Sequence, residues 1–104
     1  MLTSNGLDVV VGRALGTVLV TVRGPLRREC APELAAQLDE VLDERPERVV
    51  IDLTGLTAVD ESGTHALTAA KQAADAARIE LQLTSRRAEV LAALGPVVTE
   101  IPLV

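Results

Sequence analysis

Two runs rich in β-branched residues open the chain. Residues 7–11 (LDVVV) and 17–22 (TVLVTV) each have the composition of a β-strand, and the glycine-bounded stretch 12–16 joins them. Two such runs separated by a short loop that contains glycine are typical of an antiparallel hairpin, so we expect one here. Residues 1–6 lack any such pattern, and we expect them to be flexible.

A helical repeat follows the hairpin. Pro32 occupies a position suited to the first turn of a helix, and after it leucine and valine recur at three- and four-residue spacings. This pattern predicts an amphipathic helix that ends before Pro46. The apolar face of this helix consists of Leu34, Leu38, Val41 and Leu42.

The middle of the chain contains a second strand and a second helix. Residues 48–53 (RVVIDL) are mostly apolar, which is typical of a central strand that is covered on both faces. Asp52 lies near the end of this run, where we expect a solvated strand-end or turn residue, and Gly55 with its polar neighbours predicts a turn. Residues 62–77 then predict a helix whose apolar positions are mostly alanine, so that it can lie close to the sheet.

The last quarter of the chain predicts a strand, a helix and a short final strand. Residues 79–84 (IELQLT) alternate between apolar and polar side chains with the period of a strand. Ser85 is placed to cap a third helix, which Gly95 and Pro96 would end. Residues 97–101 are a candidate for the last strand.

The order of these elements predicts an α/β fold. We expect a mixed β-sheet with an N-terminal antiparallel hairpin, later strands that are parallel through right-handed crossovers, and three to four helices. The 104 residues form one domain (1–104), because a chain of this length holds a single core.

Composition and charge narrow the possible function classes. The aromatic content is 0%, so the core is built from leucine, valine, isoleucine and alanine. The net charge of −5 argues against a nucleic-acid partner, which would require clustered lysine and arginine. No apolar run is long enough to span a membrane, and the N-terminus lacks the basic and apolar regions of a secretory signal. We therefore expect a cytoplasmic protein without direct membrane insertion.

Catalytic and metal-binding functions find little support in the residue pattern. Cys30 and His65 are the only cysteine and histidine, which are too few soft ligands for a structural zinc site. His65 follows Ser62 by three residues, but a hydrolase also needs a group that orients the base and an oxyanion site. The scattered glycines match no phosphate-binding loop. We expect a protein that is not an enzyme and has no cofactor and no metal.

The stretch 49–63, VVIDLTGLTAVDESG, resembles the STAS domain of anti-sigma factor antagonists. The order of elements, the GPL motif at residues 24–26 and the DESG motif at residues 60–63 carry this resemblance, which covers residues 7–103. It implies a bacterial, non-catalytic transcription regulator that captures an anti-sigma factor and thereby frees a sigma factor. In the family, the anti-sigma factor is a GHKL-type serine kinase that phosphorylates the residue after the motif's aspartate, and the phosphate blocks docking.

One residue departs from this motif at the position that matters most for the switch. Asp60, Ser62 and Gly63 match the family's aspartate, second hydroxyl residue and glycine, but Glu61 stands at the phosphoacceptor position. A glutamate carries less negative charge than phosphoserine, which has about −1.5 to −2 at neutral pH. The resemblance therefore leaves two alternatives: a weakened antagonist that mimics the phosphorylated form, or an antagonist whose partner is adapted to Glu61 and whose switch lies at Ser62 or is absent.

Helix capping is a simpler interpretation of the same residues. Asp60, Glu61 or Ser62 at a helix start would pair with free N–H groups, and Gly63 would permit close packing. The residues that we expect to bind a partner or to regulate binding are Asp60, Glu61, Ser62, Gly63, Thr64, Asp52 and Leu26, with Ser62 as the possible phosphorylation site.

Two other function classes stay open. The first is a STAS subunit of a membrane transport assembly, resembling the small cytosolic subunit of lipid-transporting ABC systems, which would bind an ATPase without a phosphorylation cycle. The second is a small-ligand or nucleotide sensor, for which the sequence offers no dedicated polar pocket. In the leading interpretation the partner is the anti-sigma serine kinase, and the chain is a monomer or a weak dimer.

Overall fold

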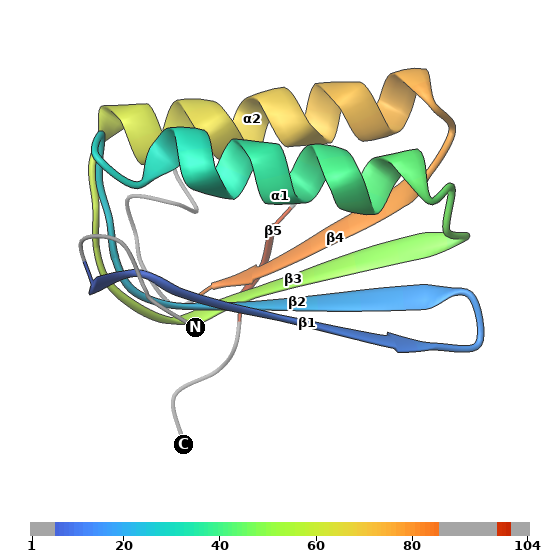
Figure 1. Ribbon diagram of the computed structural model, residues 1–104, viewed down its shortest axis with the longest axis horizontal. Coiled ribbons are helices and arrows are strands. Elements are labelled where there is room, and N and C mark those ends of the chain that lie inside the picture. The colour runs from blue at the N-terminus through green and yellow to red at the C-terminus, as the bar shows by residue number, and fades with distance from the viewer. Residues whose placement is uncertain (1–5, 86–97, 101–104) are drawn as a thin grey trace.

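A five-stranded sheet with helices on one face forms the molecule (Figure 1). The computed structural model describes residues 6–85 and 98–100. The strands lie in the order β1-β2-β3-β4-β5, with β1 antiparallel to β2 and each later pair parallel. The predicted α/β fold, with its N-terminal hairpin and parallel later strands, is therefore confirmed. In chain order the elements are β1 (Asp8–Ala14), β2 (Thr17–Leu26), α1 (Ala31–Asp43), β3 (Arg48–Val59), α2 (Glu61–Ala76), β4 (Glu80–Ser85) and β5 (Val98–Glu100).

The N-terminal hairpin is longer and its turn tighter than the sequence predicts. β1 and β2 pair from Asp8 opposite Arg23 to Ala14 opposite Thr17. The predicted loop of residues 12–16 therefore shrinks to Leu15 and Gly16, whose φ angles are 51° and 83°. Two positive φ angles define the turn type whose twist matches that of a hairpin. Leu15 is an unusual residue for this conformation.

The prediction of a turn at Gly55 is wrong, because β3 continues through this residue to Val59. The parallel ladder with β2 runs on beyond it, and two register shifts, between Thr21 and Arg23 and between Gly24 and Pro25, each accommodate one extra residue of β3. A Cβ on Gly55 would lie 2.7 Å from Cγ of Arg23, so the glycine permits close approach of two strands. Asp52 therefore lies within the strand, and its predicted place at a strand end is also wrong.

The sheet has one covered face and one outer face. In β3, Val49, Ile51 and Leu53 are buried, whereas Val50 and Asp52 on the opposite face are only half-buried. The prediction of a central strand covered on both faces is wrong, because both described helices lie on the same side of the sheet (Figure 1). The outer face includes two exposed apolar residues, Val10 at 57% and Leu19 at 45%.

The two described helices form as their sequence patterns predict. Pro32 lies in the first turn of α1, where its missing N–H leaves no intrahelical bond unmade. The narrow alanine face of α2 contributes to the core beside Leu67. The third helix predicted after Ser85 falls on residues 86–97, which lie outside the described residues. The flexibility predicted for residues 1–6 concerns residues 1–5, which also lie outside them, and Gly6. The predicted last strand is present as β5.

Candidate partner-binding site

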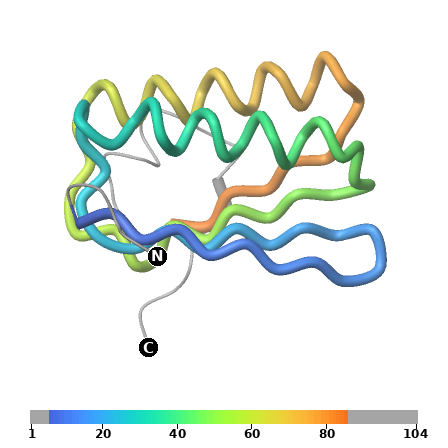
Figure 2. Tube along the Cα trace, in the orientation of Figure 1, coloured from blue at the N-terminus to red at the C-terminus, as the bar shows by residue number. Residues whose placement is uncertain are grey.

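Two chain junctions meet at the carboxyl ends of the parallel strands. The loop after β2 and the start of α2 after β3 lie at the same end of the molecule, on the left in Figure 2. The backbone N–H of Asp60 donates to the carbonyl oxygen of Leu26 at 3.1 Å, which fastens one junction to the other. In open parallel sheets this edge is where binding sites are usually found.

Asp60 is the residue that caps α2, which decides among the three candidates left open by the sequence. Its Oδ1 accepts a hydrogen bond from the N–H of Gly63 at 2.9 Å, within the first turn of the helix. Its Oδ2 accepts from the N–H of Arg28 at 2.8 Å, in the loop before α1. The N–H of Gly63, and after it that of Arg28, lower the pKa of Asp60 because they stabilise the carboxylate. One side chain thus orders two segments that are distant in sequence.

Close packing against Leu26 requires a glycine at position 63. A Cβ at position 63 would lie 2.7 Å from Cγ of Leu26 and 2.8 Å from its carbonyl oxygen. Leu26 is fully buried, with 0% exposure, and Gly63 is buried too. Both residues are therefore buried beneath the surface of the site and determine its shape through their packing.

The surface of the site consists of the next side chains of α2. Glu61 and His65 are exposed, while Ser62 and Thr64 are half-buried. The hydroxyl of Thr64 donates to the carbonyl oxygen of Asp60 at 3.1 Å, which directs it toward the helix start. Glu61, Ser62 and His65 line a shallow depression of about 210 Å³. A partner that approaches the start of α2 would meet these residues.

Two arginines lie beside this acidic helix start. Arg27 and Arg28 are exposed and, together with Asp60, Glu61 and Ser62, line a second depression of about 310 Å³. The positive charge of Arg28 contributes to the lowered pKa of Asp60. Neither arginine is among the residues predicted for the site. The basic pair before α1 is visible in the sequence, but only the parallel pairing of β2 with β3 brings it beside the acidic motif.

Asp52 is the one predicted site residue that the structure does not bring to this place. It is half-buried within β3, opposite Thr21 in β2 and Thr84 in β4. Its Oδ1 accepts from the hydroxyl of Thr54 at 2.6 Å and from the N–H of Thr54 at 3.0 Å. The hydroxyl of Thr54 is the main cause of its lowered pKa. Asp52 belongs to the outer face of the sheet.

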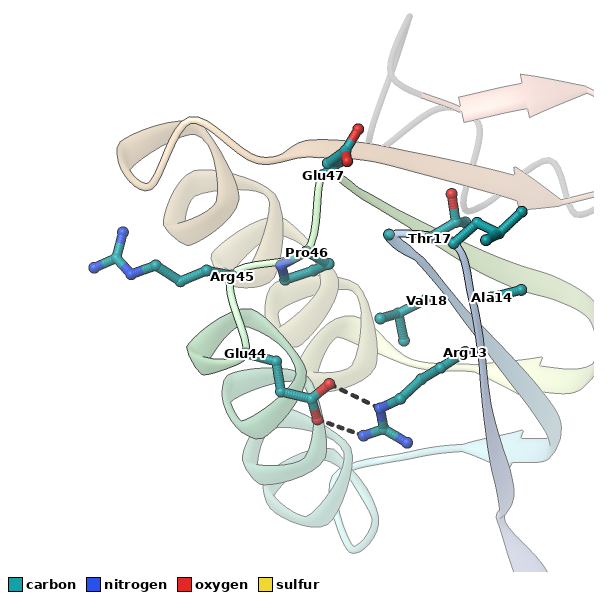
Figure 3. A pocket seen from close by; sticks show the side chains of 10 residues that line it. Arg13, Ala14, Thr17, Val18, Glu44, Arg45, Pro46 and Glu47 are labelled. Carbon is teal, nitrogen blue, oxygen red and sulfur yellow. Dashed lines mark hydrogen bonds and ion pairs between the residues drawn. The ribbon is translucent and has the colours of Figure 1, made fainter.

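A third depression lies at the opposite end of the strands. It has a volume of about 370 Å³ and includes the hairpin turn and the loop after α1 (Figure 3). Arg13 and Glu44 face each other there and form a two-pronged ion pair, which lowers the pKa of Glu44. This pair ties the hairpin to the end of α1.

Within residues 6–85 and 98–100, no group of three histidine, cysteine, aspartate or glutamate side chains is arranged to hold a metal ion. None of the helices in this part of the chain is long and apolar enough to cross a membrane.

The fold and the helix-start motif define a STAS domain. The family model for this domain matches residues 8–95, which is most of the chain, and the protein belongs to this family. A comparison of the sequence with curated proteins finds no match.

Solved structures with the same fold include regulators of sigma factors. An anti-sigma factor antagonist from Mycobacterium paratuberculosis is similar with a TM-score of 0.78 and 19% identity, over 99% of this chain and 92% of that one. The antagonist SpoIIAA of Bacillus, in its unphosphorylated form, has a TM-score of 0.74 and 13% identity, over 91% of this chain and 90% of that one. A sulfate transporter family protein from Wolinella succinogenes has a TM-score of 0.60 and 24% identity, over 78% and 66%.

Proposed function

We propose that this STAS domain is a non-catalytic regulatory module that captures an anti-sigma factor through the start of α2, residues 60–63. The observation that carries the proposal is the double anchorage of Asp60, which holds two junctions together while Glu61 stays exposed and Ser62 half-exposed. A preordered surface costs little entropy when a partner binds. The similarity to two anti-sigma factor antagonists over nearly their whole length supports the choice of partner. The proposal implies a cytoplasmic protein.

Glu61 gives this surface a fixed negative charge. It lies in the first turn of α2, where the helix dipole favours an anion. In the family's motif this position accepts the phosphoryl group, so a glutamate here keeps part of the phosphorylated charge at all times. Arg27 and Arg28 add positive charge beside it, so the surface that a partner meets has both signs.

Ser62 is the hydroxyl residue available for a phosphorylation switch in this proposal. It lines both depressions at the helix start and is half-buried. A phosphate at Ser62 would add about −1.5 to −2 charge beside Glu61, which changes the surface that the partner meets. Incubation with the cognate kinase and ATP, followed by mass spectrometry, tests this step. Absence of added phosphate at Ser62 would remove the switch from the proposal.

The capture itself is tested with variants of Glu61. Glu61→Ser and Glu61→Ala are compared with wild type and with Glu40→Ala, which removes an exposed carboxylate from α1. We expect both Glu61 variants to change the affinity for the anti-sigma factor and Glu40→Ala to leave it unchanged. Stronger capture by both identifies Glu61 as a phosphate mimic, and weaker capture by both identifies a partner adapted to glutamate. Equal capture by all four proteins would exclude Glu61 from the interface.

A second candidate function is a STAS subunit of a membrane transport assembly, such as an ABC-type lipid transporter. The similarity to a sulfate transporter family protein is the observation that favours it. Affinity purification separates the two candidates. Recovery of an ATP-hydrolysing transport subunit, with no sigma-regulating kinase, would support the transporter and contradict the antagonist.

A further inference from the structure

β1 is a seven-residue edge strand with little protection against pairing with a strand of another molecule. β1 is the first strand of the sheet, and its only strand partner among the described residues is β2. Its central residues, Val9 to Gly12, are uncharged and include no proline. Natural edge strands usually carry lysine, proline or a bulge there, because an open edge accepts another strand. Over these four residues β1 has none of these features, and its charged residues, Asp8 and Arg13, lie toward its two ends.

The hairpin geometry determines which backbone groups point outward. Ala14 and Thr17 flank the two-residue turn and form its hydrogen-bonded closing pair. Hydrogen-bonded and non-hydrogen-bonded pairs alternate along an antiparallel ladder, so every second residue of β1 turns its N–H and C=O away from β2. These residues are Val9, Val11 and Arg13. They are symmetric about Val11, as a two-fold strand pair requires.

We propose that two copies of this chain associate through antiparallel pairing of their β1 strands, centred on Val11. In this register Val11 lies opposite Val11 of the second copy, and Val9 lies opposite Arg13 of the second copy. All three outward-facing residues of each strand then find a partner. The two sheets become one continuous sheet, and the assembly carries two copies of the candidate site at residues 60–63.

The side chains of the outer face favour this register. Val10 of each copy lies opposite Gly12 of the other, and a Cβ on Gly12 would meet no atom within 4 Å. Leu19 of β2 lies directly opposite Gly12, on the same face of the sheet. Val10 of the second copy therefore approaches Leu19 over the missing side chain, and both exposed apolar residues lose contact with water.

Burial agrees with a second copy as the occupant of this edge. Val9 and Val11 are only half-buried on the helix face, which leaves apolar area there to cover. One strand pair is small beside the roughly 1,200 Å² of a stable interface, so we expect a dissociation constant in the micromolar range or weaker.

The first test is sedimentation velocity from micromolar to millimolar protein, recorded with interference optics because the chain has no tryptophan or tyrosine. We expect a concentration-dependent dimer for wild type and for the control Gln82→Lys, which adds the same charge to the outer face on β4. Val10→Lys should weaken association about tenfold or more, because the lysine would lie against Gly12 and Leu19. Circular dichroism verifies that both variants are folded.

The second test examines the register. Val10→Cys and Gly12→Cys are oxidised with glutathione disulfide, separately and as a mixture, and native Cys30 is buried in all samples. A cross-linked dimer that forms mainly in the mixture supports pairing about Val11. Cross-linking of Val10→Cys alone to the same extent, a dimer unaffected by Val10→Lys, or a wild type that stays monomeric at every concentration would each overturn the proposal.

Discussion

Substitution of Gly63 by alanine tests whether the start of α2 is as tightly packed as the structure indicates. The added Cβ would lie 2.7 Å from Cγ, 2.8 Å from the carbonyl oxygen and 3.1 Å from Cδ2 of Leu26. Leu26 cannot move aside easily, because it is fully buried and its carbonyl oxygen accepts the N–H of Asp60. We therefore expect α2 to shift at its start and to strain the hydrogen bond between Gly63 and Asp60.

The magnitude follows from two opposing effects. Overpacking of a well-packed core costs about 1–3 kcal/mol. Alanine recovers up to about 1 kcal/mol over glycine in a helix, because it loses less backbone entropy on folding. We expect a net destabilisation of roughly 1–2 kcal/mol, which for a domain of about 100 residues corresponds to a fall in Tm of roughly 5–15 °C.

Calorimetry is the suitable assay, since the chain has no aromatic residue to report unfolding by fluorescence. Gly12→Ala is the matched control, because an added Cβ there meets nothing within 4 Å, and we expect its Tm to equal or slightly exceed that of wild type, since alanine loses less backbone entropy on folding. Both proteins are measured at the same low concentration, so that the proposed association through β1 does not contribute to the Tm. A Gly63→Ala protein as stable as wild type would refute the argument from packing against Leu26.

Three further predictions concern the hairpin turn, the helix cap and the ion pair. Leu15→Asn should stabilise the protein by roughly 1 kcal/mol in thermal unfolding, because Leu15 is fully exposed at a positive φ of 51° and asparagine adopts this conformation more easily; an unchanged Tm would contradict this. The pKa of Asp60 is lowered in the folded state, so its contribution is present above the unfolded value of about 3.9 and is lost as the pH falls through the lower folded value. Asp60→Asn should therefore lower the Tm at neutral pH and reduce the fall of the Tm in acid. An unaltered dependence of the Tm on pH would exclude a stabilising role of the Asp60 carboxylate. A double-mutant cycle on Arg13 and Glu44 should give a small coupling in denaturant unfolding that shrinks further in high salt, because both side chains are exposed; a large salt-independent coupling would contradict it.

Local patterns were sufficient for most of the fold. The β-branched runs of the hairpin, the 3.6-residue repeat after Pro32 and the alternation before Ser85 each depend on neighbours in sequence, and each predicted the correct element. The pattern failed at Gly55, because the preference of glycine for turns was outweighed by the pairing of β3 with the end of β2. That pairing is a tertiary contact, and no local signal contains it.

The candidate site, too, was only partly predictable from local sequence. The sequence alone determined that an acidic motif, with Glu61 directly after Asp60, opens a helix. Only the tertiary structure decided that Asp60 is the cap, that Arg28 lies beside it and that Asp52 belongs to the outer face. The physical reason is the parallel sheet, which brings the carboxyl ends of β2 and β3 together although the residues that follow them are far apart in the chain.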